Sequence, residues 1–332
     1  MNNLKLTYQG DIALNLTPIS SNFKRSDNIN SLGEDFSFDL INNPLDPYMD
    51  LKDKIPAMGG KIIFENNGKT IFTGILKDKK RSGLSGHSYI AYDYGYFLNK
   101  DEIYKQFNGC SSSDAIKEIC KLKNIPVDTI VDINVAIKHI YNGNTISDAI
   151  KDILKKATAE NGINYRLEMR QNKLYIDKMS SLIVTATYKP APNANEFNAA
   201  LVPANFSASD SIQDMITKVV VTSEKQKDVQ IVATAEDAEK TKTFGSLVHY
   251  EKVDHKKLGQ AQTIANQKLK ELSKVKQERS VKLFGDDGVR SGRTIVLALP
   301  DLDLVGNYLI TNCTHEYSNI NHFMTLKLKK EE

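Results

Sequence analysis

The stretch 61–76, KIIFENNGKTIFTGIL, decides how the first hundred residues of the chain fold. Apolar residues lie on both sides of a central Asn67-Gly68 pair. Asn-Gly readily adopts the positive φ angles of a tight β-turn, so the stretch predicts a hairpin with strands at 61–64 and 70–76. A period-two pattern recurs around it, with apolar faces made by Leu4, Leu6, Tyr8, Ile12, Leu14, Leu16, Phe36, Phe38 and Leu40. We therefore predict that this part of the chain is mainly β.

Residues 87–98 concentrate aromatic area in Tyr89, Tyr92, Tyr94, Tyr96 and Phe97. These rings can form a buried core or an exposed platform on which bases or sugars stack. A platform needs neighbouring cations, and Lys80 and Arg81 lie too near a predicted turn to serve. The pattern therefore favours an aromatic core.

From about Asn108 the apolar period changes from two to 3.6, which predicts helices. The first is expected at 114–122, with Ser113 as its N-cap and Pro126 beyond its end. The sequence SDAIKEI at 113–119 recurs 34 residues later as SDAIKDI at 147–153. The repeat predicts a second, duplicated helix.

The second helix is expected to end near Gly162, because glycine is common just past helix C-termini. A hairpin follows, with strands predicted at 165–169 and 174–176 around Gln171-Asn172. Repeats of 34 residues also occur in tetratricopeptide solenoids. Only two copies occur, and a β-like stretch separates them, so the pattern favours a small α+β unit.

The C-terminal part begins with a stretch, 186–211, rich in Pro, Ala, Asn and Ser that is interpreted as a linker. Strands are predicted at 216–222 and 229–232. A long amphipathic helix is predicted at 256–279, with one apolar stripe made by Leu258, Ala261, Ala265, Leu269, Leu272 and Val275. The last predicted strands are at 280–284, 294–299, 308–313 and 324–328.

The opposite face of the predicted long helix carries Lys256, Lys257, Lys268, Lys270, Lys274 and Lys276. Glu271 and Glu278 dilute this charge, and no aromatic residues lie between the lysines. A solvated or partner-facing surface is therefore favoured over a nucleic-acid site. We expect the last four lysines to face an acidic neighbour or the lumen of a ring.

Together these elements predict an α+β fold that is mainly β. Residues 1–105 are predicted to form an N-terminal β-barrel-like domain. Residues 106–200 are predicted to form a small α+β domain with the duplicated helix and the linker. Residues 201–332 are predicted to form a second β-barrel-like domain that carries the long helix 256–279.

Composition narrows the function classes. The 332 residues include 44 Lys and Arg against 41 Asp and Glu, a net charge of +3, which argues against a nucleic-acid binder. The three cysteines, Cys110, Cys120 and Cys313, cannot build a disulfide scaffold and are typical of a reducing compartment. No apolar run approaches the roughly 18 residues that span a membrane, and residues 1–16 alternate instead of forming a targeting signal. We expect a soluble protein made in the cytoplasm, without membrane insertion.

Motifs for catalysis are incomplete. Gly59-Gly60-Lys61 lacks the flanking residues of a phosphate-binding loop, and GLSGH at 83–87 misplaces the last glycine of a nucleophile elbow. Asp301–Gly306 lacks the later ligands of a calcium loop and is interpreted as a β-turn. Cys313 and His315 share a strand face but lack the paired spacing of a zinc site.

These gaps predict no catalytic, cofactor-binding or metal-binding residues, no cofactor and no enzyme activity. The six histidines are interpreted as ordinary surface or core residues. A carboxylate pair for glycoside hydrolysis is defined by its separation in space, which the sequence leaves open.

Several short runs, in order along the chain, carry a resemblance. They are Phe72-Thr73-Gly74, Ala91-Tyr92-Asp93, Phe97–Lys100, Ser211–Met215, Thr217–Val221, Phe244–Leu247, Phe284-Gly285-Asp286, Arg290-Ser291-Gly292, Gly306–Ile310 and His315. In this succession the chain resembles the baseplate hub proteins of contractile phage tails and of phage-tail-like bacteriocins (tailocins). It is most similar to the hubs of defective Gram-positive prophage tails, and more distantly to the late control protein D group.

The resemblance implies a structural protein of a contractile injection system. Such hubs form homotrimers under the tail tube, and each subunit contributes two similar β-barrels, so that a six-fold tube can sit on a three-fold spike. The implied partners are the tail tube protein, the spike or needle protein and other baseplate proteins. Assembly in the bacterial cytoplasm would precede release in the phage or bacteriocin particle. The alternative is a cell-wall (peptidoglycan) hydrolase or carbohydrate-binding module of the tail tip, although no appended domain is expected.

Overall fold

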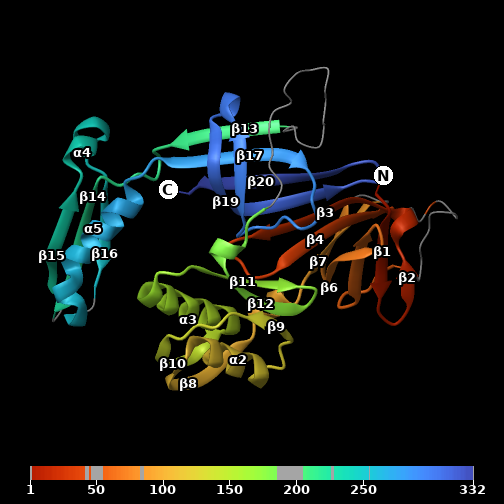
Figure 1. Cartoon of the computed structure of the whole chain (residues 1–332), viewed down its shortest axis with the longest axis horizontal. Coiled ribbons are helices and arrows are strands. Elements are labelled where there is room, and N and C mark those ends of the chain that lie inside the picture. The colour runs from red at the N-terminus through yellow and green to blue at the C-terminus, as the bar shows by residue number, and fades with distance from the viewer. Residues whose placement is uncertain are drawn as a thin grey trace. The chain divides into compact units, whose positions relative to one another are not determined.

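The computed structural model describes residues 2–41, 45, 55–82, 86–184, 205–225, 228–253 and 255–331 (Figure 1). The chain is mainly β, which confirms the predicted fold class. It divides into two compact units: unit 1 combines Met1–Phe206 with Ser280–Glu332, and unit 2 is Ser207–Arg279. The domain boundaries expected at 105/106 and 200/201 stay predictions.

Unit 1 is built on a sheet whose strands come from both ends of the chain. The N-terminal strands are β1 (Leu4–Gln9), β2 (Ala13–Asn15), β3 (Ser20–Asn28), β4 (Glu34–Ile41), β5 (Lys61–Asn66), β6 (Lys69–Ser82) and β7 (Gly86–Tyr92). The C-terminal strands are β17 (Lys276–Phe284), β18 (Thr294–Leu299), β19 (Leu304–Tyr317) and β20 (His322–Lys330). The same sheet includes β13 (Asn205–Ser211), which, like β17, crosses the boundary between the units.

The hydrogen-bonded order of this sheet is β13-β17-β20-β19-β3-β4-β7-β6-β5-β1-β2, and β18 pairs with β19. The seam between the two ends of the chain lies where β19 runs antiparallel to β3, with Cys313 opposite Asp27. The last strands of the chain are therefore joined directly to the first ones.

The hairpin predicted at 61–76 is confirmed. Asn67 and Gly68 adopt φ angles of 50° and 77°, and β5 pairs antiparallel with β6. Inward-facing side chains of these strands build an aromatic core, in which the ring centroids of Phe36 and Phe64 lie 4.6 Å apart. Offset and tilted ring pairs of this kind add stability beyond the burial of their area.

The aromatic run at 87–98 is divided between core and surface. Tyr89 is buried and stacks on Phe38, with centroids 5.3 Å apart, as expected of a core. Tyr94 is 38% exposed, because it precedes the short helix α1 (Gly95–Leu98) and does not lie on a strand. Lys77 Nζ lies 4.7 Å from the ring centroid of Phe97. The core interpretation is correct for Tyr89 and wrong for Tyr94.

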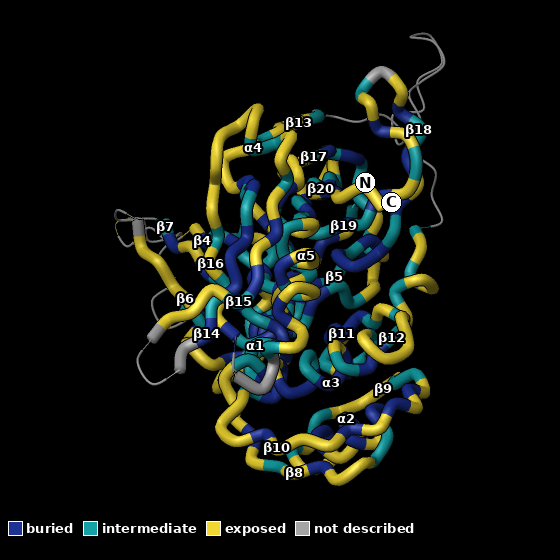
Figure 2. The backbone as a smooth tube through the Cα atoms, turned by 90° about the vertical axis from the view of Figure 1, so that its left-hand side faces the viewer, coloured by how far each residue is buried: buried dark blue, intermediate teal, exposed yellow. Residues whose placement is uncertain are grey.

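The duplicated part of unit 1 follows α1. Its first copy is β8 (Glu102–Ser111), α2 (Ser112–Leu122) and β9 (Val127–Ile130), and its second is β10 (Ala136–Thr145), α3 (Ile146–Asn161) and β11 (Tyr165–Arg170), followed by β12 (Lys173–Lys178). β8 and β10 pair antiparallel as a two-stranded ribbon that is largely exposed (Figure 2), and β9, β12 and β11 form a three-stranded sheet. The predicted hairpin is confirmed, with positive φ at Gln171 and Asn172.

The helix ends differ from the expectation at one position. The N-cap of α2 is Ser111, whose side chain accepts a hydrogen bond from the Asp114 N–H, so the prediction of Ser113 is wrong. Ser113 lies inside the first turn, because the chain leaves the β conformation two residues earlier than the apolar period indicates. The expected C-terminal glycine of α3 is confirmed: Gly162 has φ 73°.

Unit 2 is a small two-layer unit. Its strands are β14 (Lys218–Lys225), β15 (Asp228–Glu236) and β16 (Val248–Lys252), ordered β15-β14-β16, with β16 parallel to β14. A helix α4 (Ala238–Phe244) follows β15, and a 3-10 turn η5 (His255–Gln260) leads into α5 (Ala261–Leu272). The side chains shared by α5 and the sheet are Val219, Val221, Ala233, Ala235, Val253, Ala261 and Ala265.

The long helix predicted at 256–279 is wrong at both ends. The α-helix covers only 261–272, after the 3-10 turn that contains Gly259, and it is capped at Ser273. From Lys276 onward the chain is strand β17, in which Val281 and Leu283 alternate with polar neighbours into a core. Lys276 therefore does not share a helix face with Lys268, and it pairs with Asp214 and Glu278 instead.

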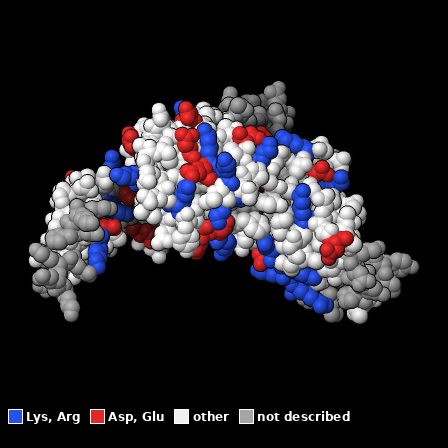
Figure 3. Space-filling view, turned by 90° about the horizontal axis from the view of Figure 1, so that it is seen from below, with Lys and Arg blue, Asp and Glu red and all other residues white. Residues whose placement is uncertain are grey.

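Two further sequence expectations have a structural outcome. Residues 186–204 of the expected linker lie outside the described residues, and its last part, 205–211, is strand β13, because Phe206 packs against a core. In the part of the chain that the structure describes, no helix is long and apolar enough to cross a membrane. On the face drawn in Figure 3, Lys and Arg lie interspersed with Asp and Glu, as the small net charge leads one to expect.

Candidate functional site: a buried junction and a cationic pocket

Charged side chains are buried together where β3, β4 and β11 meet the segment 285–293, which connects β17 to β18. We call this cluster the junction. All of it belongs to unit 1, and its charged members are Arg25, Asp27, Glu34, Arg166, Glu168, Arg290 and Arg293. Burying a charge costs several kcal/mol unless it is paired, so the partners of each group decide what the junction can do.

Glu168, on β11, accepts hydrogen bonds from two arginines. Arg293 binds it in a bidentate manner, with Nη1 2.5 Å from Oε2 and Nη2 2.8 Å from Oε1. Arg170 also donates to Glu168, and to Asp177 Oδ2 at 2.7 Å. Burial raises the pKa of Glu168, but the hydrogen bond from Arg293 and the nearby arginine charges outweigh it and lower the pKa to about 2. Glu168 is therefore an ionised anchor and not a proton donor.

Asp27, on β3, holds the backbone of segment 285–293. Its Oδ2 accepts hydrogen bonds from the Ser291 N–H at 2.9 Å and the Ser291 hydroxyl at 2.6 Å. Arg166 in turn donates to Ser291 Oγ at 2.9 Å. Gly292 has φ 78°, and a Cβ there would lie 2.7 Å from the Arg166 side chain, so only glycine fits. The run Arg290-Ser291-Gly292 is thus the part of the segment that is fixed to β3 and β11.

Glu34, at the start of β4, completes the junction. Arg290 Nη2 lies 2.8 Å from Glu34 Oε1, and Arg25 Nε lies 3.8 Å from the same atom. Burial and the Glu34 charge raise the pKa of neighbouring Asp93 to about 8, although Arg290 and the Gly95 N–H oppose the shift. Both carboxyl groups line a pocket of about 350 Å³, together with the arginines.

β19 brings the sequence-predicted pair Cys313 and His315 together, with Sγ 3.1 Å from Nε2. His322 on β20, which sequence analysis did not associate with them, has its Nε2 2.9 Å from His315 Nδ1. His315 Nε2 also lies 2.9 Å from the Val289 carbonyl oxygen, and Tyr317 donates to Asp287 at 2.8 Å. This cluster therefore also holds segment 285–293, through its contacts with Val289 and Asp287.

The chemistry of this cluster is that of a neutral packed core. Burial raises the pKa of the Cys313 thiol well above its usual value and lowers the pKa of His315 well below its own. A cysteine nucleophile needs the opposite, a thiolate stabilised by a charged neighbour. Among the described residues, no group of three or more His, Cys, Asp or Glu side chains could hold a metal ion.

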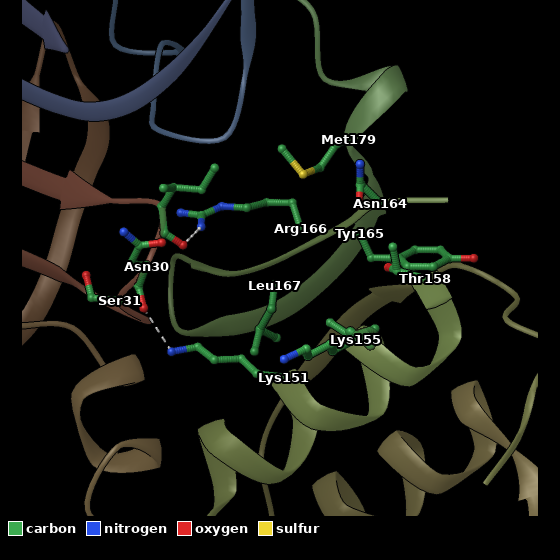
Figure 4. Close-up of a pocket in the computed structure, with 12 residues that line it drawn as sticks. Asn30, Ser31, Lys151, Lys155, Thr158, Asn164, Tyr165, Arg166, Leu167 and Met179 are labelled. Carbon is green, nitrogen blue, oxygen red and sulfur yellow. Dashed lines mark hydrogen bonds between the residues drawn. The ribbon is translucent and has the colours of Figure 1, made fainter. Parts of the chain in front are cut away.

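A second pocket, of about 340 Å³, lies between α3, β11 and the residues that follow β3 (Figure 4). Lys151 and Lys155 extend into it from α3, one helical turn apart, and Arg166 reaches it from β11. Lys151 Nζ donates to the Asn30 carbonyl at 3.1 Å, and Arg166 Nη1 donates to the Ile29 carbonyl at 2.7 Å. The pocket is therefore cationic, and backbone oxygens hold two of its three charged groups in place.

The motifs discarded on sequence grounds have structural roles. Gly60 packs against Tyr8, and a Cβ there would lie 2.1 Å from the ring, so the glycine admits the tyrosine and forms no phosphate loop. The β-turn interpretation of Asp301–Gly306 is correct only for its first half: a 3-10 turn (Pro300–Leu302) ends at Asp303, with φ 54°, and Leu304–Gly306 already belong to β19. Most of the GLSGH run, 83–85, lies outside the described residues.

Sequence analysis missed most of the junction, although a signal was present. In β3 and β4, Arg25, Asp27 and Glu34 occupy inward-facing positions, on the same faces as the buried Phe23 and Phe36. A charged residue on the apolar face of a strand indicates a buried ion pair. Apart from the pair that Arg25 and Glu34 form with each other, the partners are more than a hundred residues away, so the sequence gives no means of naming them.

The chain belongs to the YQBQ-like family, whose profile matches residues 24–329. It is 26% identical over 274 residues to the Bacillus subtilis (strain 168) protein YqbQ, a match that covers 81% of this chain and 80% of that protein. It is also 26% identical over 276 residues to the phage-like element PBSX protein XkdQ of the same organism, with the same coverage.

Solved structures share the fold over almost the whole chain. The 43 kDa tail protein of prophage MuSo2 from Shewanella oneidensis superposes with a TM-score of 0.71 at 13% identity, covering 99% of this chain and 97% of that protein. A tail protein from Neisseria meningitidis MC58 gives 0.65 at 14% identity, with the same coverage. The Escherichia coli type VI secretion component c3393 gives 0.52 at 9% identity, covering 99% of this chain and 77% of that one.

Proposed function

We propose that this protein is the structural baseplate hub of a contractile tail or tailocin. In this role three copies form a ring that adapts the six-fold tail tube to the three-fold spike. The observation that carries the proposal is a fold shared from end to end with phage tail proteins, in a chain whose relative XkdQ belongs to a phage-like element. The partners are the tail tube protein, the spike or needle protein and other baseplate proteins. The protein would assemble in the bacterial cytoplasm and leave in the released particle.

The buried junction supports a mechanical role. Segment 285–293 is fixed to β3 by Asp27 and to β11 by Arg293, so the N-terminal strands, the duplicated part and the C-terminal strands behave as one body. A hub that transmits force between a tube and a spike needs rigid subunits. Open strand edges, such as that of β2 at one end of the sheet, are natural contacts for another subunit.

Light scattering on the purified chain tests the ring directly. We expect a particle three times the 37.2 kDa chain mass, and three-fold rings by electron microscopy. A chain that stays monomeric at all concentrations, and does not respond to added tube or spike protein, would contradict the hub.

The alternative function, a cell-wall hydrolase or carbohydrate-binding module, draws support from one observation. Glu34 and Asp93 line one pocket with raised pKa values, and such pairs can act in acid–base catalysis. Because arginines pair with Glu34, we expect no turnover of wall sacculi. Turnover that Glu34→Gln or Asp93→Asn abolishes would establish the hydrolase instead.

A further inference from the structure

The pocket beside α3 contains two lysines, Lys151 and Lys155, that form no ion pair with a described carboxylate. Three cations line it, Lys151, Lys155 and Arg166, and none of its described lining residues is Asp or Glu. Among the described residues, no carboxylate lies within 4.0 Å of either lysine Nζ. Arg166 differs from the two lysines, because it also belongs to the junction and lies 3.9 Å from Asp27 Oδ2 and 3.8 Å from Glu168 Oε2.

Two of the three cations are fixed in place. Lys151 is tethered to the Asn30 carbonyl and Arg166 to the Ile29 carbonyl, which leaves further N–H donors on both groups. Arg166 is 6% exposed, and its Nε is buried without a hydrogen-bond partner. Burial lowers the pKa of Lys151; the charge of Asp148 opposes this shift and that of Arg166 adds to it. An anion would relieve this repulsion and bind the spare donors.

The rest of the lining suits a ligand with an organic part better than a bare inorganic ion. Ser31 and Asn164 add polar groups, and Leu154, Leu167 and Met179 add apolar side chains to the lining. A space of about 340 Å³ is several times larger than a single inorganic ion needs. We propose that this pocket binds a small organic phosphate, whose phosphate group contacts Lys151, Lys155 and Arg166.

The first copy of the repeat supplies a matched contrast. Lys117 and Lys121 of α2 stand at the positions of Lys151 and Lys155, 34 residues earlier. Lys117 Nζ lies 3.7 Å from Asp114 Oδ1, so its charge is already paired. Both lysines of α2 are exposed, and neither lines one of the two pockets described above. The site is therefore a property of the second copy and not of the repeated sequence.

Calorimetric titration with glycerol 3-phosphate at constant ionic strength tests the proposal. The full-length chain and the control K117Q/K121Q should bind with equal affinity. K151Q/K155Q should bind at least about tenfold more weakly, because it removes two charged contacts to the phosphate group. The unfolding temperature without ligand should be the same in all three, because these lysines are partly or fully exposed.

Four outcomes would overturn the proposal in whole or in part. If the wild type did not bind glycerol 3-phosphate, or if both double variants lost affinity equally, the proposed site would be contradicted. If succinate bound as tightly as glycerol 3-phosphate, the proposal that the pocket recognises a phosphate group would be contradicted. If inorganic phosphate bound equally well, the organic part of the proposed ligand would be contradicted. The inference is independent of the hub, because light scattering on the same samples reports the oligomeric state separately.

Discussion

The two copies of the repeat, β8–α2 and β10–α3, are built alike up to the first turn of each helix. Ser111 and Thr145 cap their helices in the same way, each accepting a hydrogen bond at 3.1 Å from the backbone N–H three residues on. Gly109 and Gly143 both adopt positive φ, at 100° and 75°. The matching buried pairs are Ile103 and Ile137, Phe107 and Tyr141, Ala115 and Ala149, and Ile116 and Ile150.

The copies diverge after this shared part. α3 has 16 residues against 11 in α2, and it leads into β11, which carries Arg166 and Glu168 into the junction. α2 leads only into the short edge strand β9. The features that both copies share, the caps and the buried pairs, therefore stabilise each copy by itself. The features found only in the second copy, the longer α3 and the charged residues of β11, connect it to the sheet of unit 1.

The largest effect should come from breaking that connection. We expect Glu168→Gln to lower the free energy of unfolding by about 3–5 kcal/mol, because it leaves buried arginines without their carboxylate. Glu118→Gln is the control in the first copy, where Glu118 forms a partly exposed pair with Lys105 at 2.5 Å. This change should cost at most about 1 kcal/mol.

Urea unfolding followed by circular dichroism measures both changes. Equal costs for the two variants would mean that the junction is no more important than a surface ion pair. The second copy would then contribute no more to stability through its junction residue than the first copy does through its surface pair.

Acid should destabilise the fold through the buried histidines His315 and His322, which contact segment 285–293. An unfolded histidine has a pKa near 6.5, whereas burial lowers that of His322 to about 4 and that of His315 well below its usual value. The charge of Arg25 lowers both further, and Asp287 opposes the shift at His322. The unfolded chain thus binds protons that the folded chain does not. Stability should be complete above about pH 6.5 and should fall as the pH drops toward 4.

The expected loss from His322 alone is about 3 kcal/mol between pH 7 and pH 4. Unfolding curves of the wild type and of His322→Gln, taken across this range, isolate it from the titration of carboxylates. The variant should show a shallower dependence on pH. His139→Gln, on the exposed ribbon of the second copy, should leave the wild-type slope unchanged, and an equal flattening in both variants would exclude the buried pair as the cause.

The strands and helices were predictable because their signals are local. The Asn67-Gly68 turn, the alternation of Phe36 and Phe38, and the repeat at 113–119 and 147–153 each need only neighbouring residues to be recognised. The error at 256–279 has the same origin. Apolar residues at Leu269, Leu272 and Val275 continue the helical period, and only the packing of Val281 and Leu283 against distant strands shows that the chain has become extended.

The candidate sites were not predictable, because their parts come from distant segments. Arg293 and Glu168 are 125 residues apart, and Asp27 and Ser291 are 264 apart. Lys151 lies in the repeat at 147–153 and Lys155 two residues beyond it, and their neighbours in the sequence are nearly those of Lys117 and Lys121. Only the fold of residues 29–31 against α3 distinguishes the two pairs.

The smallest effect tests the shared part of the comparison. Ser111→Ala and Thr145→Ala each remove one side-chain cap and should each cost about 1 kcal/mol, because the backbone N–H of Asp114 or Asp148 loses its hydrogen-bond acceptor. The two costs should be equal within about 0.5 kcal/mol and should nearly add in the double variant. Thermal unfolding of the three variants, with Ser111→Thr and Thr145→Ser as conservative controls that keep a capping oxygen, measures this. A cost at Thr145 several times that at Ser111 would mean that the start of α3, and not β11 alone, carries the connection to the junction.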